Sequence, residues 1–171
     1  MSNSDHTKDI PEHLKGLPTL YVRVGERVAA APQEDVEVAR RYPSWPHKGP
    51  LKDGKRLTIM TKKVTYAVNE GVRVIHIAEV VKLGEMVYVM GPKPVYDEYV
   101  DGKLATGPLP EGGDALVPNI YQGLTLPSPA ADYNYEITSY RFSEPGTHQI
   151  QWNPGPLRSN VLTFKVQRHD R

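Results

Sequence analysis

The last third of the chain carries the feature that most constrains its fold: two alternating apolar runs separated by turn residues. The first run, Thr147 to Trp152, follows the turn Glu144-Pro145-Gly146. The second, Val161 to Val166, follows the break at residues 153–156 (NPGP). Strict alternation is typical of β-strands with one buried face, and Pro and Gly between such runs favour turns. Residues 138–166 therefore predict the closing strands of a β-sandwich.

Val72 to Val81 is the longest β-branched run, with the sequence VRVIHIAEVV. Both of its faces are largely apolar, which indicates a central strand covered on both sides. Met86 to Met90 follows after a turn, and we expect it to return as the antiparallel partner of that strand. Val95 to Val100 and Lys103 to Ala105 predict a hairpin across Asp101-Gly102, a dipeptide that favours tight two-residue turns.

The first 55 residues are expected to form an N-terminal extension of the sandwich. Residues 1–17 are polar and mixed in charge, so we expect a flexible arm. Residues 18–55 predict an extension that packs on the sandwich. Within it, Leu20 to Val24 alternates as a short strand, Val36 to Arg41 suits a helical turn, and Trp45 is a candidate anchor.

The sandwich domain itself is expected over residues 56–168. Its first strand spans Leu57 to Met60, and Val64 to Tyr66 is expected to continue that strand. Residues 106–119 form a Gly- and Pro-rich loop too long for a simple connector. Long loops on a rigid scaffold are common places for binding, which makes this loop a candidate binding element.

Composition agrees with one β-rich domain and excludes several chemistries. A chain of 171 residues can bury a substantial single core. Its sixteen prolines and fourteen glycines favour short strands and many turns over long helices. Because the chain has no cysteine, disulfides, thiolate catalysis and cysteine-based zinc sites are excluded.

Charge argues against two classes of partner. The formal net charge is +1, and residues 82–120 carry three lysines against six acidic residues, a local charge of −3. We therefore expect neither a nucleic-acid partner nor an anionic membrane partner. The N-terminal residues lack the apolar core of a signal peptide, and no apolar run approaches the length of a membrane span. We expect a cytoplasmic location, unless a signal segment preceded this sequence.

Two stretches together resemble bacterial immunoglobulin-like modules. TKKVTYAVNEGVRVIHIAEV (61–80) resembles their opening strands, with a Tyr, a Gly/Glu turn and a Val-rich strand. FSEPGTHQIQW followed by LRSNVLTFKV (142–166) resembles their closing strands, with a Ser-Asn step into the last strand. The resemblance covers roughly residues 56–168 and implies an all-β, immunoglobulin-like antiparallel β-sandwich with an N-terminal extension. It implies no activity, because such modules serve many functions. One departure is His148, where these modules usually carry Tyr.

Two histidines are candidate catalytic residues, His76 and His148. If the central strands are oriented as in the modules that the chain resembles, residues 74, 76 and 78 face inward from one sheet and residues 148, 150 and 152 face inward from the other. The two histidine rings could then meet. With Glu79, Glu136 or a tyrosine they could form an acid–base pair or ligate a metal. No H-x-H or H-E-x-x-H pattern supports a metal, so we predict no metal site and no cofactor. The alternative is that each histidine is a partly buried residue hydrogen-bonded to backbone or to a tyrosine.

Tyrosines form the second group of candidates. With methionines they could line an apolar cavity between the sheets that opens at the 106–119 loop. The candidate ligand-binding residues are Tyr88, Met90, Tyr96, Tyr99, Tyr121, Tyr135 and Trp152. Ordinary strand composition is the alternative, because β-strands favour Tyr.

Three functions follow from these features. The preferred one is a non-catalytic binding or interaction module that acts through the 92–120 hairpin and loop or through an exposed edge strand. Its partner would be another protein or a second copy of the chain, and a small apolar ligand is a further candidate. The alternative is a small cofactor-independent enzyme with a Tyr/Met-lined pocket and His76 or His148 as acid–base residue. A protease-inhibitor-like module ranks third, on fold analogy alone.

Overall fold

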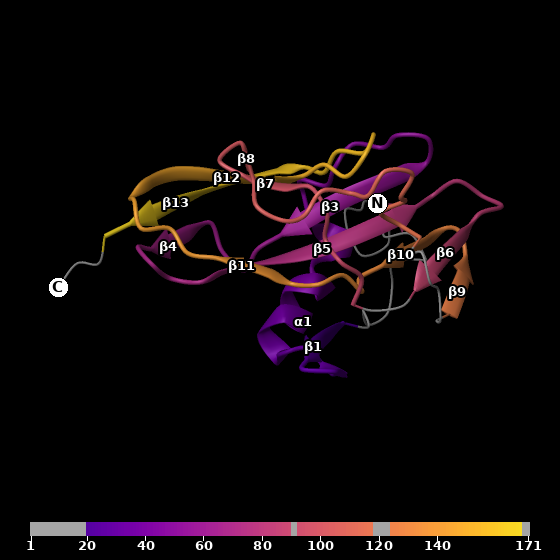
Figure 1. The fold of residues 1–171 in the computed structure, drawn as a ribbon, viewed down its shortest axis with the longest axis horizontal. Coiled ribbons are helices and arrows are strands. Elements are labelled where there is room, and N and C mark those ends of the chain that lie inside the picture. The colour runs from indigo at the N-terminus through magenta and orange to yellow at the C-terminus, as the bar shows by residue number, and fades with distance from the viewer. Residues whose placement is uncertain (1–19, 90–91, 118–123, 169–171) are drawn as a thin grey trace, which may run out of the picture.

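The computed structural model describes residues 20–89, 92–117 and 124–168 (Figure 1). The regular secondary structure of the described chain is almost entirely β-strand, with one short α-helix and one 3-10 turn. In chain order the elements are β1 (Tyr21–Val24), β2 (Arg27–Ala30), α1 (Gln33–Arg40), η3 (Tyr42–Ser44), β3 (Lys55–Met60), β4 (Thr65–Ala67), β5 (Val72–Val80), β6 (Met86–Val89), β7 (Glu98–Val100), β8 (Lys103–Leu104), β9 (Leu124–Pro127), β10 (Ala130–Asp132), β11 (Thr138–Tyr140), β12 (Gly146–Trp152) and β13 (Val161–Gln167).

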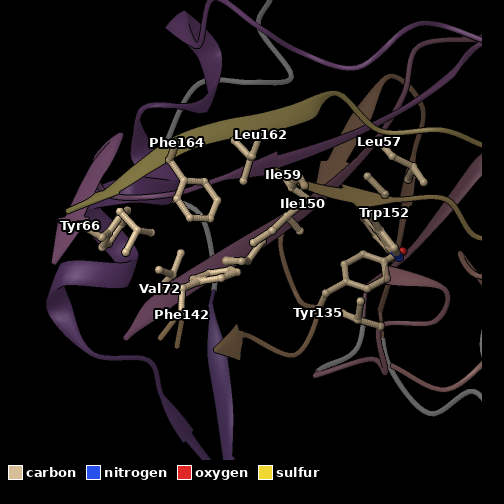
Figure 2. Close-up of a cluster of buried hydrophobic side chains, with 14 residues drawn as sticks. Leu57, Ile59, Tyr66, Val72, Tyr135, Phe142, Ile150, Trp152, Leu162 and Phe164 are labelled. Carbon is tan, nitrogen blue, oxygen red and sulfur yellow. The ribbon is translucent and has the colours of Figure 1, made fainter. Parts of the chain in front are cut away.

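Two sheets share one core, an arrangement compatible with a β-sandwich. In the first sheet β5 is central, with β3 along one edge and β10 and β11 along the other. The second sheet has the order β4-β13-β12-β7-β8, and its β4–β13 pair is parallel. Figure 2 shows side chains from both sheets meeting between them. The labelled members of this core are Leu57, Ile59, Tyr66, Val72, Tyr135, Phe142, Ile150, Trp152, Leu162 and Phe164.

Strand β5 is covered on both faces, which confirms the prediction made from its apolar run. Val74 and Ala78 point into the core between the sheets. Ile75 and Ile77 point the other way and are buried beneath residues of the N-terminal segment 20–45. In Figure 1, α1 and β1 lie on one side of β5, and β12 and β13 lie on the other.

Helix α1 joins this outer layer to β5 through an ion pair as well as apolar packing. The consecutive residues Val38 and Ala39 are buried on the side of the helix that meets β5. Asp35 in its first turn receives a fork of hydrogen bonds from Arg73 Nε and Nη2, at 3.0 and 2.7 Å. An acidic first turn also suits the positive end of a helix. The helix is longer than the single turn that Val36 to Arg41 predicted.

Two strand assignments were wrong. The segment beginning at Met86 does not pair with β5, because β3, β10 and β11 already occupy the two edges of β5. It forms β6 and pairs with β9 in a separate two-stranded ribbon. Residues 65–67 do not continue β3 either. They cross to the second sheet and pair with β13, because Tyr66 and Phe164 bury their rings together on that side.

The hairpin and the closing strands were predicted correctly. Strands β7 and β8 pair across Asp101 and Gly102, whose φ values are +50° and +82°. Positive φ at both central residues is the geometry in which Asp-Gly is favoured. Strands β12 and β13 pair in antiparallel register from Gly146 to Gln151, and Ile150 and Trp152 are fully buried.

Candidate functional site

His76 lies in the core, where its partner is a glutamate that the second sheet supplies. His76 Nε2 lies 2.5 Å from Glu98 Oε2, and the two side chains are almost inaccessible to solvent. The His76 ring also meets the Trp152 ring edge-on at 4.9 Å. Since a carboxylate only accepts, His76 Nε2 carries the hydrogen, and His76 Nδ1 has no hydrogen-bond partner among the described residues.

Glu98 remains ionised because donors surround it. Its other oxygen, Oε1, accepts hydrogen bonds from Thr138 Oγ1 and Tyr140 Oη, both at 2.6 Å. Burial raises the pKa of Glu98, but the electrostatic attraction and hydrogen bond of His76 and the two hydroxyl donors outweigh it and hold the pKa below its usual range. The Glu98 carboxylate on β7 therefore links β5 and β11 through its hydrogen bonds to His76, Thr138 and Tyr140.

The two candidate histidines do not meet. His148 Nδ1 lies 2.7 Å from Asp101 Oδ2, and His148 Nε2 lies 2.8 Å from the Glu144 carbonyl. The His76 ring contacts Trp152 on β12, and His148 lies on the same strand four residues away. Four residues of β-strand span about 13 Å. Burial lowers the pKa of His148, but its bonds to Asp101 and Glu144 outweigh this and raise the pKa above its usual value. Each histidine thus has its own carboxylate.

A cavity of about 330 Å³ lies between the β6–β9 ribbon, the end of β5 and the segment 114–117. Most of its walls are apolar or aromatic, and its charged residues are lysines and acids at the rim and floor. The lining residues are Lys55, Ala78, Val80, Glu85, Met86, Val87, Tyr88, Lys93, Asp114, Leu116, Val117, Asp132 and Tyr135. This volume lies at the lower end of the range of small-molecule sites.

The floor of the cavity holds a buried ion pair. Lys93 Nζ lies 2.5 Å from Asp132 Oδ2, and the two side chains are 3% and 1% exposed. Lys93 Nζ also donates to the Tyr88 carbonyl at 2.8 Å and to the Leu116 carbonyl at 3.3 Å. The ammonium group therefore faces one carboxylate and donates to two carbonyl oxygens within the protein. Burial raises the pKa of Asp132, although Lys93 and Asn134 act in the opposite direction.

One wall is a loop segment that two hydrogen bonds tie to this floor. Tyr135 Oη donates to the Ala115 carbonyl and Lys93 Nζ to the Leu116 carbonyl, each at 3.3 Å. The segment is closed by a bridge between Asp114 and Val117. Lys93 therefore positions two walls at once, because it also holds the backbone of β6 at Tyr88.

The structure brings together only part of the predicted ligand set. Tyr88 and Tyr135 line the cavity, and the Trp152 ring stands behind Tyr135 at 5.0 Å. Tyr99 faces a different hollow on the outside of the second sheet. The half-buried Tyr96 is not among the lining residues of the cavity. Met90 and Tyr121 lie outside the described residues.

Sequence reasoning did not select Glu98, Lys93 or Asp132 as site residues. Glu98 stood in an acidic hairpin that reads as a solvated turn, and Lys93 stood between two prolines. Their partners lie 22 and 39 positions away in the sequence, so no local pattern signals either pair. The one available hint was His76 inside an otherwise apolar run, because a buried imidazole needs a polar partner.

Two further features bear on the chemistry. Within the described residues, no group of three or more histidine, aspartate or glutamate side chains is arranged to hold a metal ion. The part of the chain that the structure describes also contains no helix long and apolar enough to cross a membrane.

Comparison of the chain with protein-family models, with curated proteins and with solved structures finds no match. The all-β architecture therefore rests on the structure itself, and a function has to be argued from the geometry of the sites.

Proposed function

We propose that the protein is a non-catalytic binding module that holds a small, largely apolar ligand in the cavity beside segment 114–117. The observation that carries this proposal is the lining: Met86, Tyr88, Leu116 and Tyr135 surround a volume of about 330 Å³. Apolar and aromatic walls with a few fixed polar groups are typical of small-molecule sites. Four of its lining residues, Lys93, Asp114, Leu116 and Val117, belong to the 92–120 region that was predicted as a binding surface, and the β7–β8 hairpin contributes none.

We further propose that the scaffold is immunoglobulin-like, on the basis of its strand order. In that fold, three strands of one sheet follow the order C-F-G, and variable-type domains add a strand beside C. The order β8-β7-β12-β13 corresponds to this arrangement, with β5 and β11 as neighbours in the opposite sheet. The first strand would be divided between the sheets, as β3 and β4.

Edge-strand docking has less support than the cavity. In the second sheet the outer strands β8 and β4 have two and three residues, too few to template a long pairing. In the first sheet the outer edge of β3 is already occupied. Asn160 donates to the Ile59 carbonyl and accepts from the Ile59 amide. Gly49 packs so closely there that an added methyl group would lie 1.9 Å from the Leu57 carbonyl oxygen.

Binding is also better supported than catalysis. An acid–base residue must reach the substrate, yet His76 is fully buried and does not line the cavity. The ionisable groups at the cavity floor, Lys93 and Asp132, are paired with each other. Lys93 is a positioning residue under this proposal, because it holds both walls of the cavity.

Titration with N-phenylnaphthylamine, an uncharged apolar fluorescent probe, tests the proposal. We expect saturable binding with one probe per chain. Met86→Asp, at the rim of the cavity, should weaken binding of the probe at least about tenfold, because the apolar probe would then desolvate a carboxylate. Leu83→Asp is the matched control, because Leu83 is exposed, lies three residues away and does not line the cavity.

Two results would overturn the proposal: no saturable binding by the folded protein, or equal loss in the Met86 and Leu83 variants. A second variant, Leu116→Trp, guards against a local effect of charge. The tryptophan side chain is larger than leucine, so it should fill part of the cavity and reduce binding of the probe without adding any charge.

A further inference from the structure

The outer face of the second sheet differs in chemistry from the outer face of the first. Residues 20–45 cover β5 of the first sheet. The outward side chains of the second sheet are instead exposed or half-exposed, and most are amides and hydroxyls. The uncharged polar ones include Tyr99 on β7, Thr147, Gln149 and Gln151 on β12, and Thr163 and Gln167 on β13, and the exposed apolar Val161 and Leu104 lie among them. Amides and hydroxyls both donate and accept hydrogen bonds, so this face offers a set of neutral polar groups to a ligand.

A hollow of about 540 Å³ is formed on this face, where β7, β12 and the turn before β13 meet. Its lining is more polar than apolar, with the exposed Val161 as an apolar member, and it carries one acidic and one basic residue, so it has no net charge. The lining residues are Asp97, Tyr99, Gly102, Gln149, Ile150, Gln151, Asn153, Gly155, Arg158 and Val161. Ile150 itself points inward, so the floor there is backbone.

Several groups in the hollow are held in place by the protein. Asn153 Nδ2 donates to Gln151 Oε1 at 3.2 Å, and Gln151 Nε2 donates to the Ser159 carbonyl at 3.1 Å. Asp97 Oδ2 accepts from the Leu109 amide at 3.0 Å. The bonds from Asn153 and to the Ser159 carbonyl orient the Gln151 amide and leave its second N–H available. Pre-organised polar groups lose less entropy when a ligand binds.

Other groups in the hollow are uncommitted. Within the described residues, the Gln149 amide and the Tyr99 hydroxyl make no side-chain hydrogen bond. An amide both donates and accepts, as does a tyrosine hydroxyl. The half-exposed Tyr99 ring adds an apolar surface beside these groups. Arg158, by contrast, turns back to the Gly155 and Leu157 carbonyls.

We propose that this hollow binds a neutral carbohydrate. A sugar offers hydroxyls that both donate and accept, matching the amides, and a C–H face that suits the Tyr99 ring. An anionic ligand is disfavoured because Asp97 balances Arg158, whose Nη1 is already bonded. An apolar ligand is disfavoured because it would strip water from amides without replacing their hydrogen bonds. The site is separate from the apolar cavity and does not depend on it.

An array of neutral oligosaccharides, followed by calorimetric titration of the strongest binder, tests this assignment. Gln149→Ala and Tyr99→Ala should each weaken binding at least about tenfold. Gln167→Ala is the matched control, because it removes the same amide from the same sheet face outside the hollow. It should leave binding within about twofold. N-phenylnaphthylamine binding should be unchanged in all three variants, which separates failure here from failure of the cavity proposal.

Three results would overturn the assignment. The first is that no neutral oligosaccharide binds the folded protein. The second is that binding persists when Gln149 and Tyr99 are replaced. The third is that sedimentation shows a dimer that Gln149→Arg dissociates, because the face would then be an interface between two copies of the chain.

Discussion

Replacing Glu98 by glutamine tests whether the buried charge between the sheets stabilises the fold. The carboxylate accepts three hydrogen bonds, at 2.5 Å from His76 and 2.6 Å from both Thr138 and Tyr140. Glutamine keeps the shape and one acceptor oxygen. However, it removes the charge, and its NH₂ group can replace the oxygen that faces His76 Nε2. The change therefore alters the electrostatics with little change in packing.

The size of the effect follows from these contacts. The two hydroxyl bonds become neutral, which costs about 1 kcal/mol each. The His76 contact either sets two donors against each other or shifts the hydrogen to His76 Nδ1, which has no partner. An unsatisfied buried donor costs about 1–3 kcal/mol. Relief from burying a charge offsets part of this loss. We expect a net decrease of about 2–4 kcal/mol in the free energy of unfolding.

The loss should depend on pH with a definite sign. Glu98 has a lowered pKa in the folded state, so its contribution is present above the unfolded glutamate pKa, near 4.3, and is lost as pH falls through the folded pKa. The difference between wild type and Glu98→Gln should therefore be full at pH 7 and shrink below about pH 4.

Urea unfolding at several pH values, followed by tryptophan fluorescence, measures this difference, because the Trp152 ring contacts His76. Asp101→Asn is the matched control, since it replaces a carboxylate that also faces a histidine but is 41% exposed. The control should cost less than about 1 kcal/mol at pH 7. Equal losses in the two variants would refute the reasoning, as would a Glu98→Gln protein as stable as wild type.

Three further predictions concern stability. Lys93→Met should cost about 3–5 kcal/mol at pH 7, because Asp132 would be a buried charge without its partner. Burial already raises the pKa of Asp132, so the loss should be smaller at pH 4, where that carboxyl can protonate; equal losses at both pH values would contradict this. Asp101→Asn should reduce stability more at pH 6 than at pH 8.5, because the raised pKa of His148 makes its contribution present below about 6.5 and lost as pH rises through the folded value. Gly49→Ala should cost at least about 2 kcal/mol in thermal or urea unfolding, because its methyl group would meet a β3 carbonyl oxygen at 1.9 Å; unchanged stability would show that this edge can move.

Local patterns predicted the strands best where alternation and turn residues agreed. The β7–β8 hairpin followed from Asp101-Gly102, and β12 and β13 followed from their alternating runs. The same patterns could not choose partners. Met86 and its neighbours read as the return strand of β5, yet they pair with β9, because pairing depends on which edges the rest of the chain has already filled.

The candidate site divides in the same way. Alternation predicted that His76 shares a face with Val74 and Ala78, and that Ile150 shares one with Trp152, because side chains alternate across any strand. The resemblance to immunoglobulin-like modules indicated that these faces point inward, and His76, Ile150 and Trp152 are buried. Only the tertiary structure decided that His76 meets Glu98, and that Lys93 meets Asp132 at the floor of a cavity. These contacts join residues 22 and 39 positions apart, and they depend on how strands stack and pair in space. The sequence by itself therefore determined a β-rich chain with polar residues in its core, and the packing of the two sheets decided which of those residues form pairs.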